Sequence, residues 1–260
     1  VLHRGASPIM LFDAGGRFVR AWGDGLFSSG KVGGIAPGDR TPGQSGYTAV
    51  YGAAGCHACG AHAIRVDPDG NIWIVDAPGH VIYKMDPTGR VLMELGSKGV
   101  SSESRTIFNL PTDVAFGPGG EVYVSDGYGN ARVVKYTADG QYLLEWGSRG
   151  TGPGEFGLPH NLAVDTEGRV YVTDRDNARV QVFDADGGFL QEWPDIGGNS
   201  ALFMTTTDDQ HLWTGGTLRD LDGAVVATLP GGNGGHGMTV SDGDVFVAQL
   251  AGRVQKFVVP

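Results

Sequence analysis

The chain has 260 residues, of which 40 % are hydrophobic and 18 % are charged, and its net charge is −10. This apolar content can fill a core, which excludes a disordered chain, and the length suits one large all-β domain or two small ones. The negative charge argues against nucleic acid and anionic membranes as partners, and no apolar run reaches the length of a spanning helix.

The N-terminal segment, "VLHRGASPIMLFDAGGRFVRAWG", begins in the middle of a strand unit. It offers the later strands of a four-stranded unit and lacks the innermost one. We therefore expect further residues upstream of Val1.

Residues 26–60 differ from the rest of the chain. They are rich in Gly, Ser and Pro and lack the rhythm of strands. Long loops in compact domains are usually functional or disordered. We interpret this stretch as an insertion between the first two strand units that covers one end of the central channel, with a solvated loop of no role as the alternative.

The insertion contains the two cysteines of the chain, Cys56 and Cys59, in "GCHACGAH". Three interpretations stay open: a local disulfide in an exported protein, free thiols, or metal ligation helped by His57. A structural zinc site usually needs a second such pair or added histidines at fixed spacing, so we expect cysteines bonded to each other or free. A secreted or periplasmic protein is the expected location, although no signal peptide is visible.

One pattern repeats along the rest of the chain: an apolar strand, a "D-x-x-G" turn, an aromatic-rich strand ending in Asp, and two further strands around a "D-G" turn. The copies begin at His62, Thr112, His160, roughly Ala201, and His236. Four short strands at a period of about 50 residues indicate a propeller blade. With the N-terminal segment as an incomplete first blade, we predict an all-β, six-bladed β-propeller that forms a single domain over residues 1–260.

Histidine opens the innermost strand on alternate blades of this predicted propeller. His62, His160 and His236 occupy the same repeat position, whereas Thr112 stands there in the intervening blade. A lone histidine would be expected to cap a strand, but three at equivalent positions should converge near the axis. Three neutral imidazoles with an open fourth position suit catalytic Zn²⁺.

The second strand of each blade ends near the same mouth of the channel. Arg175 stands there in blade 4, Arg4 in blade 1 and Tyr128 in blade 3. Arginine binds carboxylates bidentately, and a tyrosine beside Zn²⁺ and arginine can act as a base. The alternative for each arginine is a surface ion pair. Arg132 and Arg179, which recur in "NAR", are assigned to blade structure.

The repeat resembles the NHL-repeat propellers, and most specifically the peptidyl-α-hydroxyglycine α-amidating lyase family. "LHRG", "AHAIRVDPDGNIWIVD", "SDGYGNAR" and "PHNLAVD…DRDNAR" carry the likeness, which is strongest over residues 67–183. The resemblance implies a six-bladed propeller that splits an α-hydroxyglycine end into an amide and glyoxylate. It implies zinc ligands and active-site side chains at the positions found from the repeat: His62, His160, His236, Tyr128, Arg4 and Arg175.

The chain departs from the family pattern at four positions. Gly234 stands where the family has a methionine, and Gly237 where it has an aspartate that binds structural calcium. A calcium site is therefore doubtful. Asn109 and Gly129 replace the family's disulfide beside the tyrosine.

Three functions remain in competition at this point. The first is a zinc-dependent lyase acting on carbinolamide substrates, either small molecules or peptide C-termini, as a monomer. The second is another metal-dependent hydrolase or lyase that uses the same three histidines. The third is a non-enzymatic NHL binding scaffold, because propellers host many functions.

Overall fold

The computed structural model describes most of the chain. The described residues are 1–3, 5–34, 47–50, 60–196, 201–205, 209–231, 235–241, 243–249 and 252–258. This part of the chain consists of strands and turns with one 3-10 turn, η2 (Arg175–Asn177), and contains no α-helix. None of its helical segments has the length and apolar character needed to cross a bilayer.

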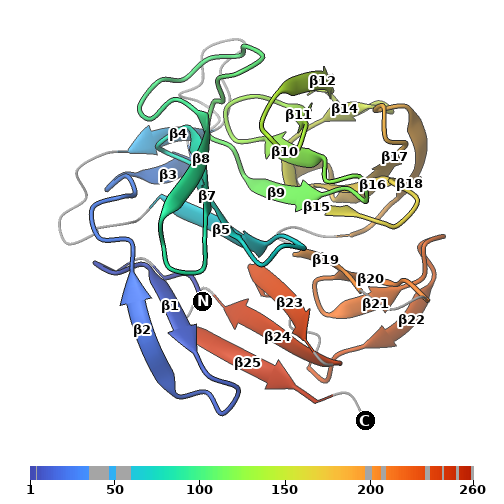
Figure 1. Cartoon of the computed structure of the whole chain (residues 1–260). Coiled ribbons are helices and arrows are strands. Elements are labelled where there is room, and N and C mark those ends of the chain that lie inside the picture. Colours follow the sequence, from blue (N-terminus) through green and yellow to red (C-terminus); the bar gives the residue numbers. More distant parts are fainter. Residues whose placement is uncertain are drawn as a thin grey trace.

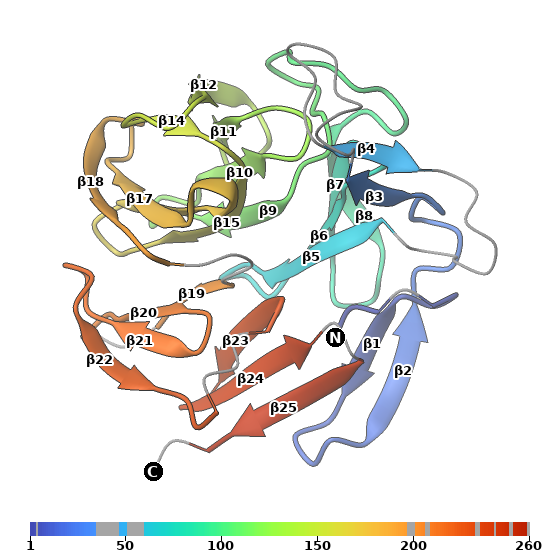
Figure 2. The same cartoon turned by 180° about the vertical axis from the view of Figure 1, so that it is seen from behind.

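Five antiparallel sheets, with their strands in chain order, form the blades of a propeller. The first four are β5 (Ala61–Val66), β6 (Ile72–Asp76), β7 (Val81–Met85) and β8 (Val91–Gly96); β9 (Asp113–Phe116), β10 (Val122–Asp126), β11 (Arg132–Tyr136) and β12 (Tyr142–Trp146); β15 (Pro159–Val164), β16 (Val170–Asp174), β17 (Arg179–Phe183) and β18 (Phe189–Trp193); and β19 (Leu202–Met204), β20 (Leu212–Thr214), β21 (Thr217–Arg219) and β22 (Val225–Thr228). The fifth is β23 (Gly237–Ser241), β24 (Asp244–Gln249) and β25 (Arg253–Phe257). A short parallel pair, β13 (Ser148–Arg149) and β14 (Glu155–Phe156), links the second and third blades. Figures 1 and 2 show the five sheets around a common centre, with the first strand of each nearest to it.

The all-β propeller is confirmed, but the prediction of six blades is wrong. The N-terminal segment forms a two-stranded hairpin, β1 (Ile9–Phe12) and β2 (Phe18–Trp22), and not a blade. Residues 1–3 pair with it through an isolated bridge between Leu2 and Ile9, but no further strand of the described residues joins this sheet, so it lacks the inner strands of a blade. Ile9 is buried in a cluster with Phe27 and Ile74, which seats the hairpin against the β5–β8 blade.

Asp/Gly turns make these sheets, as the repeat indicated. At the first turn, Asp67 Oδ1 accepts the Asn71 N–H at 2.8 Å, and Gly70 has a φ of 82°, which glycine adopts without strain. The second strands end at the predicted aspartates, Asp126 and Asp174 among them.

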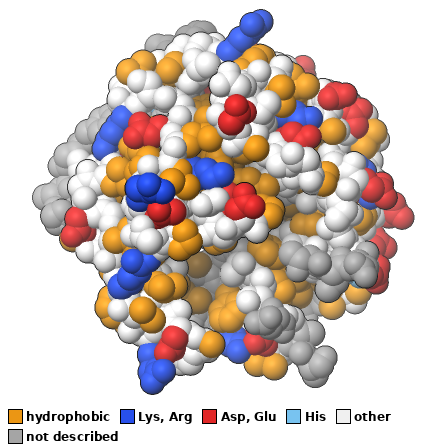
Figure 3. Space-filling view, viewed as in Figure 1, with side chains coloured by type: hydrophobic (Ala, Val, Ile, Leu, Met, Phe, Trp, Pro, Cys, Tyr) orange, Lys and Arg blue, Asp and Glu red, His pale blue; other side chains and the backbone are white. Residues whose placement is uncertain are grey.

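Clusters of buried apolar side chains hold successive blades together. Trp73 and Ile82 pack against Val122 and Val134 of the next blade, and similar clusters lie between the following pairs of blades. On the face shown in Figure 3, Lys and Arg side chains lie among Asp and Glu side chains and not in one block. The burial of apolar side chains between the blades accounts for the packing of the sheets, because the hydrophobic effect is the usual driving force for such packing.

The recurring "NAR" arginines have the structural role that was assigned to them. Arg132 Nε lies 3.0 Å from Asp126 Oδ2, and Arg179 Nε lies 3.0 Å from Asp174 Oδ2. Each arginine also bonds a glutamate of the next strand at 2.7 Å. These pairs tie the second strand of a blade to its outer strands.

The insertion contains a hairpin that its glycine-rich sequence did not reveal. Strands β3 (Lys31–Gly34) and β4 (Tyr47–Val50) pair antiparallel. Val32 packs against a buried cluster of Leu110, Tyr128 and Leu158, so this part of the insertion borders the predicted site. Cys56 and Cys59 lie outside the described residues.

Candidate metal centre

Three histidines from three blades meet at the centre of the propeller. His62 lies in β5, His160 lies in β15, and His236 comes directly before β23. The ring centroids are 5.0–5.5 Å apart, and one ligand nitrogen from each ring lies within 4.8 Å of the others. The repeat pattern predicted this convergence, and it survives the change from six blades to five because the inner strands still surround one axis.

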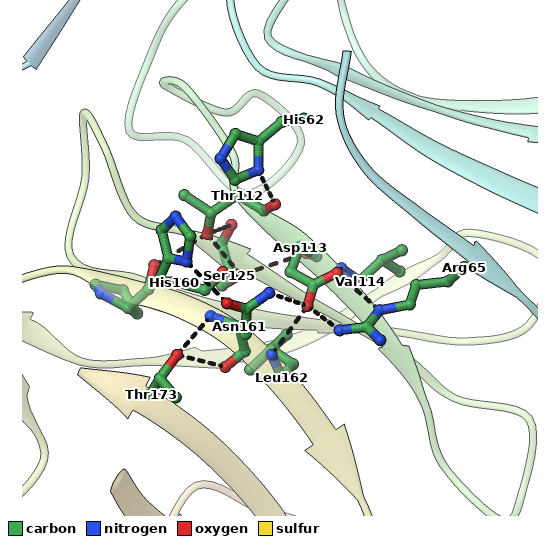
Figure 4. Close-up of polar contacts among 11 residues, drawn as sticks. His62, Arg65, Thr112, Asp113, Val114, Ser125, His160, Asn161, Leu162 and Thr173 are labelled. Atoms are coloured by element: carbon green, nitrogen blue, oxygen red, sulfur yellow. Dashed lines mark hydrogen bonds and ion pairs between the residues drawn. The ribbon is translucent and has the colours of Figure 1, made fainter. Parts of the chain in front are cut away.

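Hydrogen bonds fix the proton position on two of these rings. His62 Nδ1 lies 2.7 Å from the Thr112 carbonyl oxygen, and His160 Nδ1 lies 2.8 Å from Asn161 Oδ1 (Figure 4). Both oxygens can only accept, so each Nδ1 must carry a proton and donate it. A neutral imidazole has a single N–H, and each Nε2 therefore presents a lone pair.

Burial keeps both rings neutral. The pKa of His160 is lowered to about 3, mainly by burial, with smaller contributions from His236 and Arg175 in the same direction, while the Asn161 hydrogen bond acts against them. Burial also lowers the pKa of His62 well below its ordinary value, with His160 and His236 acting in the same direction. At neutral pH both imidazoles are therefore neutral, and each Nε2 lone pair is available to bind a cation.

Tyr128 faces the same point. Its Oη lies 2.9 Å from His62 Nε2 and 3.1 Å from His160 Nε2. A phenol has one proton and can donate to only one of these two nitrogens. In the other contact, a lone pair of the Tyr128 oxygen therefore faces a lone pair of the histidine nitrogen. A cation shared by these atoms removes that conflict. The chemistry of this donor set therefore fits a metal ion held by His62, His160 and His236, and Zn²⁺ prefers such nitrogen ligands.

Arg175 lies beside the tyrosine. It begins η2 after strand β16, and its N–H donates to the Leu158 carbonyl at 2.8 Å. Its guanidinium carbon is 5.6 Å from the centroid of the Tyr128 ring, and its Nε pairs with Asp176 Oδ1 at 3.0 Å. The structure thus brings five of the six predicted residues together, whereas Arg4 lies outside the described residues.

The positions that depart from the family pattern are also placed in part. Gly237 lies in β23, paired with Ala248, and Gly234 lies outside the described residues. Asn109 and Gly129 are neighbours, since the Gly129 N–H donates to the Asn109 carbonyl at 2.9 Å. No side-chain oxygen is available at Gly237 to bind a cation.

Sequence reasoning missed the polar residues behind the histidines. Asn161 Oδ1 accepts a hydrogen bond from His160 Nδ1–H, and Asp113 in turn accepts one from the Asn161 amide. The adjacent "HN" in "PHNLAVD" was a signal for the first contact. Nothing in the sequence alone indicated the second, because it joins two blades.

Comparisons with known proteins agree with this architecture. The family model for the NHL repeat matches residues 108–136 and 156–183. The chain carries NHL repeats. It is also homologous to amidating enzymes. The match to peptidylglycine alpha-amidating monooxygenase of Rattus norvegicus is 38% identical over 124 residues, which covers 45% of this chain and 13% of that protein.

Of two further relatives, one is named as a lyase and the other only for its NHL repeats. A probable peptidyl-alpha-hydroxyglycine alpha-amidating lyase of Caenorhabditis elegans is 37% identical over 120 residues, covering 45% of this chain and 34% of that protein. NHL repeat-containing protein 3 of Homo sapiens is 34% identical over 115 residues, covering 41% and 33%. The chain thus spans about a third or less of the length of these curated relatives.

Solved structures support the fold of this NHL-repeat chain. A streptogramin B lyase structure aligns with a TM-score of 0.53 at 17% identity, covering 77% of this chain and 69% of that one. A protein of unknown function from Bacteroides caccae aligns with a TM-score of 0.53 at 11% identity, covering 87% and 85%. At such identities the likeness establishes the propeller alone.

Proposed function

We propose that this chain is a zinc-dependent lyase that splits the N–C bond of an α-hydroxyglycine-type carbinolamide into an amide and glyoxylate. The observation that carries the proposal is the donor set at the axis: two Nε2 lone pairs and the Tyr128 hydroxyl within 2.9–3.1 Å, with His236 beside them. Homology to proteins named amidating lyases supports the choice of reaction.

His62, His160 and His236 would hold the ion. When bound, Zn²⁺ supplies Lewis acidity that lowers the pKa of a substrate hydroxyl. Asn161 and the Thr112 carbonyl keep the His160 and His62 rings oriented with Nε2 toward the centre. This orientation matters because three ligands from three blades must point to one position.

Tyr128 would move the proton. As a phenolate, its Oη takes the proton of the substrate hydroxyl, and the oxygen electrons form the carbonyl of glyoxylate as the C–N bond breaks. The same Oη returns the proton to the departing amide nitrogen, so that no net proton is gained or lost. Tyr128 is 7% exposed, which limits competing proton exchange with water.

Arg175 would bind the substrate carboxylate, because a guanidinium grips a carboxylate with two parallel hydrogen bonds. It is suited to this role by its place beside the Tyr128 ring. Arg4 is proposed as a second carboxylate contact. We further propose that the substrate is a small molecule or a peptide C-terminus. The enzyme would act as a monomer and would be secreted or periplasmic.

A second candidate is another metal-dependent hydrolase or lyase on a small molecule. Gly234 and Gly237 favour it, since both replace side chains of the amidating family near the third histidine. The homology to NHL repeat-containing protein 3 keeps a binding scaffold as the third.

One experiment separates these functions. Zinc-loaded protein is incubated with several N-acyl-α-hydroxyglycines, and glyoxylate is measured, with the matching N-acylglycines, which lack the hydroxyl, as controls. Glyoxylate from the hydroxylated compounds alone supports the lyase. Turnover of small esters or lactones without glyoxylate would favour a hydrolase, and turnover of none would favour the scaffold.

A further inference from the structure

A buried carboxylate lies behind the histidine cluster and joins three blades. Asp113, in β9, is 0% exposed. Its Oδ1 accepts a hydrogen bond from Arg65 Nε of β5 at 3.0 Å. Its Oδ2 accepts bonds from Arg65 Nη2 at 2.5 Å, from Asn161 Nδ2 at 3.0 Å and from the Leu162 N–H of β15 at 3.2 Å. One anion thus links the inner strands of three successive blades.

The direction of these bonds determines how the Asn161 amide lies. A carboxylate can only accept, so the Asn161 group that faces Asp113 must be the NH₂. The amide oxygen then points the opposite way, toward His160 Nδ1 at 2.8 Å (Figure 4). If the amide oxygen and nitrogen were exchanged, the Asn161 oxygen would face the Asp113 carboxylate, and the Asn161 NH₂ would face the Nδ1–H of His160.

The same contacts determine the state of the imidazole. With an oxygen acceptor at Nδ1, His160 is held with its proton there and with its lone pair on Nε2, the atom that faces Tyr128. His160 is 0% exposed and Asn161 is 5% exposed, so water does not compete for these bonds. Arg65 pairs with Asp113, and its positive charge offsets the cost of burying this carboxylate among the three blades.

We propose that Asp113 and Asn161 are positioning residues that hold His160 in the tautomer with the proton on Nδ1 and so direct its Nε2 at the metal position. The inference rests on the proposed metal site and is independent of the lyase reaction. Residues behind a ligating histidine typically change metal affinity by about 10–100-fold when they are replaced. The alternative is a clamp between blades that contributes stability alone.

The test has a readout that a clamp would not affect. In metal-free protein with ¹⁵N-labelled histidine, long-range ¹H–¹⁵N spectra report which ring nitrogen carries the proton. Wild type should show His160 protonated at Nδ1. Asn161→Ala should shift the ring toward the Nε2–H tautomer and weaken zinc binding, measured by competition with a chelator, by about 10–100-fold. Asp113→Asn should act in the same direction.

Two further variants separate positioning from stability. Asp165→Asn is a matched control, because Asp165 is a buried carboxylate in the blade that carries His160 and is 2% exposed. It accepts hydrogen bonds from Arg169 and Tyr171, and within the described part of the chain it bonds to no histidine. It should lower stability and leave both the His160 tautomer and the zinc affinity unchanged. Asn161→Asp keeps an oxygen for Nδ1–H, and the carboxyl pair that it forms with Asp113 must hold one proton between its two groups. It should retain the tautomer, even if the alanine variant fails to fold.

Several results would overturn the proposal. These are a wild-type His160 protonated at Nε2, an unchanged tautomer and zinc affinity in Asn161→Ala, or an equal loss of zinc affinity in Asp165→Asn. Wild-type protein that binds no zinc would contradict the proposed function, while the tautomer would still decide the positioning role. Zinc binding without glyoxylate release would contradict the lyase alone.

Discussion

Lowering the pH from 7 to 5 should destabilise the metal-free protein, because His160 is buried as a neutral imidazole. Burial lowers its pKa to about 3, whereas an imidazole in the unfolded chain has a pKa of about 6.5. Below pH 6.5 the unfolded chain binds a proton that the folded chain does not, so stability is lost as the pH falls. Each pH unit costs about 1.4 kcal/mol, which gives about 2 kcal/mol at pH 5.

Urea unfolding in the presence of a chelator measures this effect, with His160→Gln as the reference. Contributions from titrating groups that do not interact with His160 are shared by the two proteins and cancel in the comparison, so the difference reports His160 together with its coupling to His62 and His236. The free energy of unfolding of the wild type should therefore fall between pH 7 and 5 by about 2 kcal/mol more than that of the variant. Equal pH dependence in the two proteins would refute the buried, neutral state of His160.

Three more substitutions test other parts of the account. Tyr128→Phe should lower turnover by about 10²–10⁴-fold and leave zinc content unchanged, whereas full activity would remove the tyrosine from the mechanism. Arg175→Ala should raise KM for a substrate with a carboxylate more than for its amide, and an equal rise would argue against carboxylate binding. Gly187→Ala should lower the free energy of unfolding by about 1–3 kcal/mol more than Gly70→Ala does, because the new Cβ would lie 2.7 Å from Trp146. Gly70→Ala is the control, since both glycines have a left-handed backbone but the space around Gly70 is open. Equal thermal shifts of these two glycine variants would contradict that packing.

The repeat explains why so much of the site could be predicted. A position that recurs in each blade maps to one level around the axis, so His62, His160 and His236 could be placed together without knowledge of any contact. Tyr128 and Arg175 followed from the ends of the second strands in the same way. Neither inference needed the correct number of blades, because the first two strands of each blade lie around one axis in a propeller of five blades as in one of six.

Features outside the repeat were the ones that could not be predicted. The N-terminal hairpin matched the outer strands of a blade in sequence, but whether a blade forms depends on inner strands that a local pattern does not report. The β3–β4 hairpin has only four residues per strand, and these strands lie in a stretch rich in Gly, Ser and Pro, so it gave no periodic signal. The bond from Asn161 to Asp113 joins residues 48 positions apart in different blades, and only packing brings them together.

The most direct test of the central claim is the zinc K-edge X-ray absorption spectrum of purified, zinc-loaded protein. If His62, His160 and His236 hold the ion, the spectrum should show three imidazole nitrogens at about 2.0–2.1 Å and no sulfur. The same spectrum of His160→Ala should lose one imidazole. A sulfur shell at about 2.3 Å, the distance of a Cys56 or Cys59 thiolate, or a spectrum without imidazole scattering, would contradict the account.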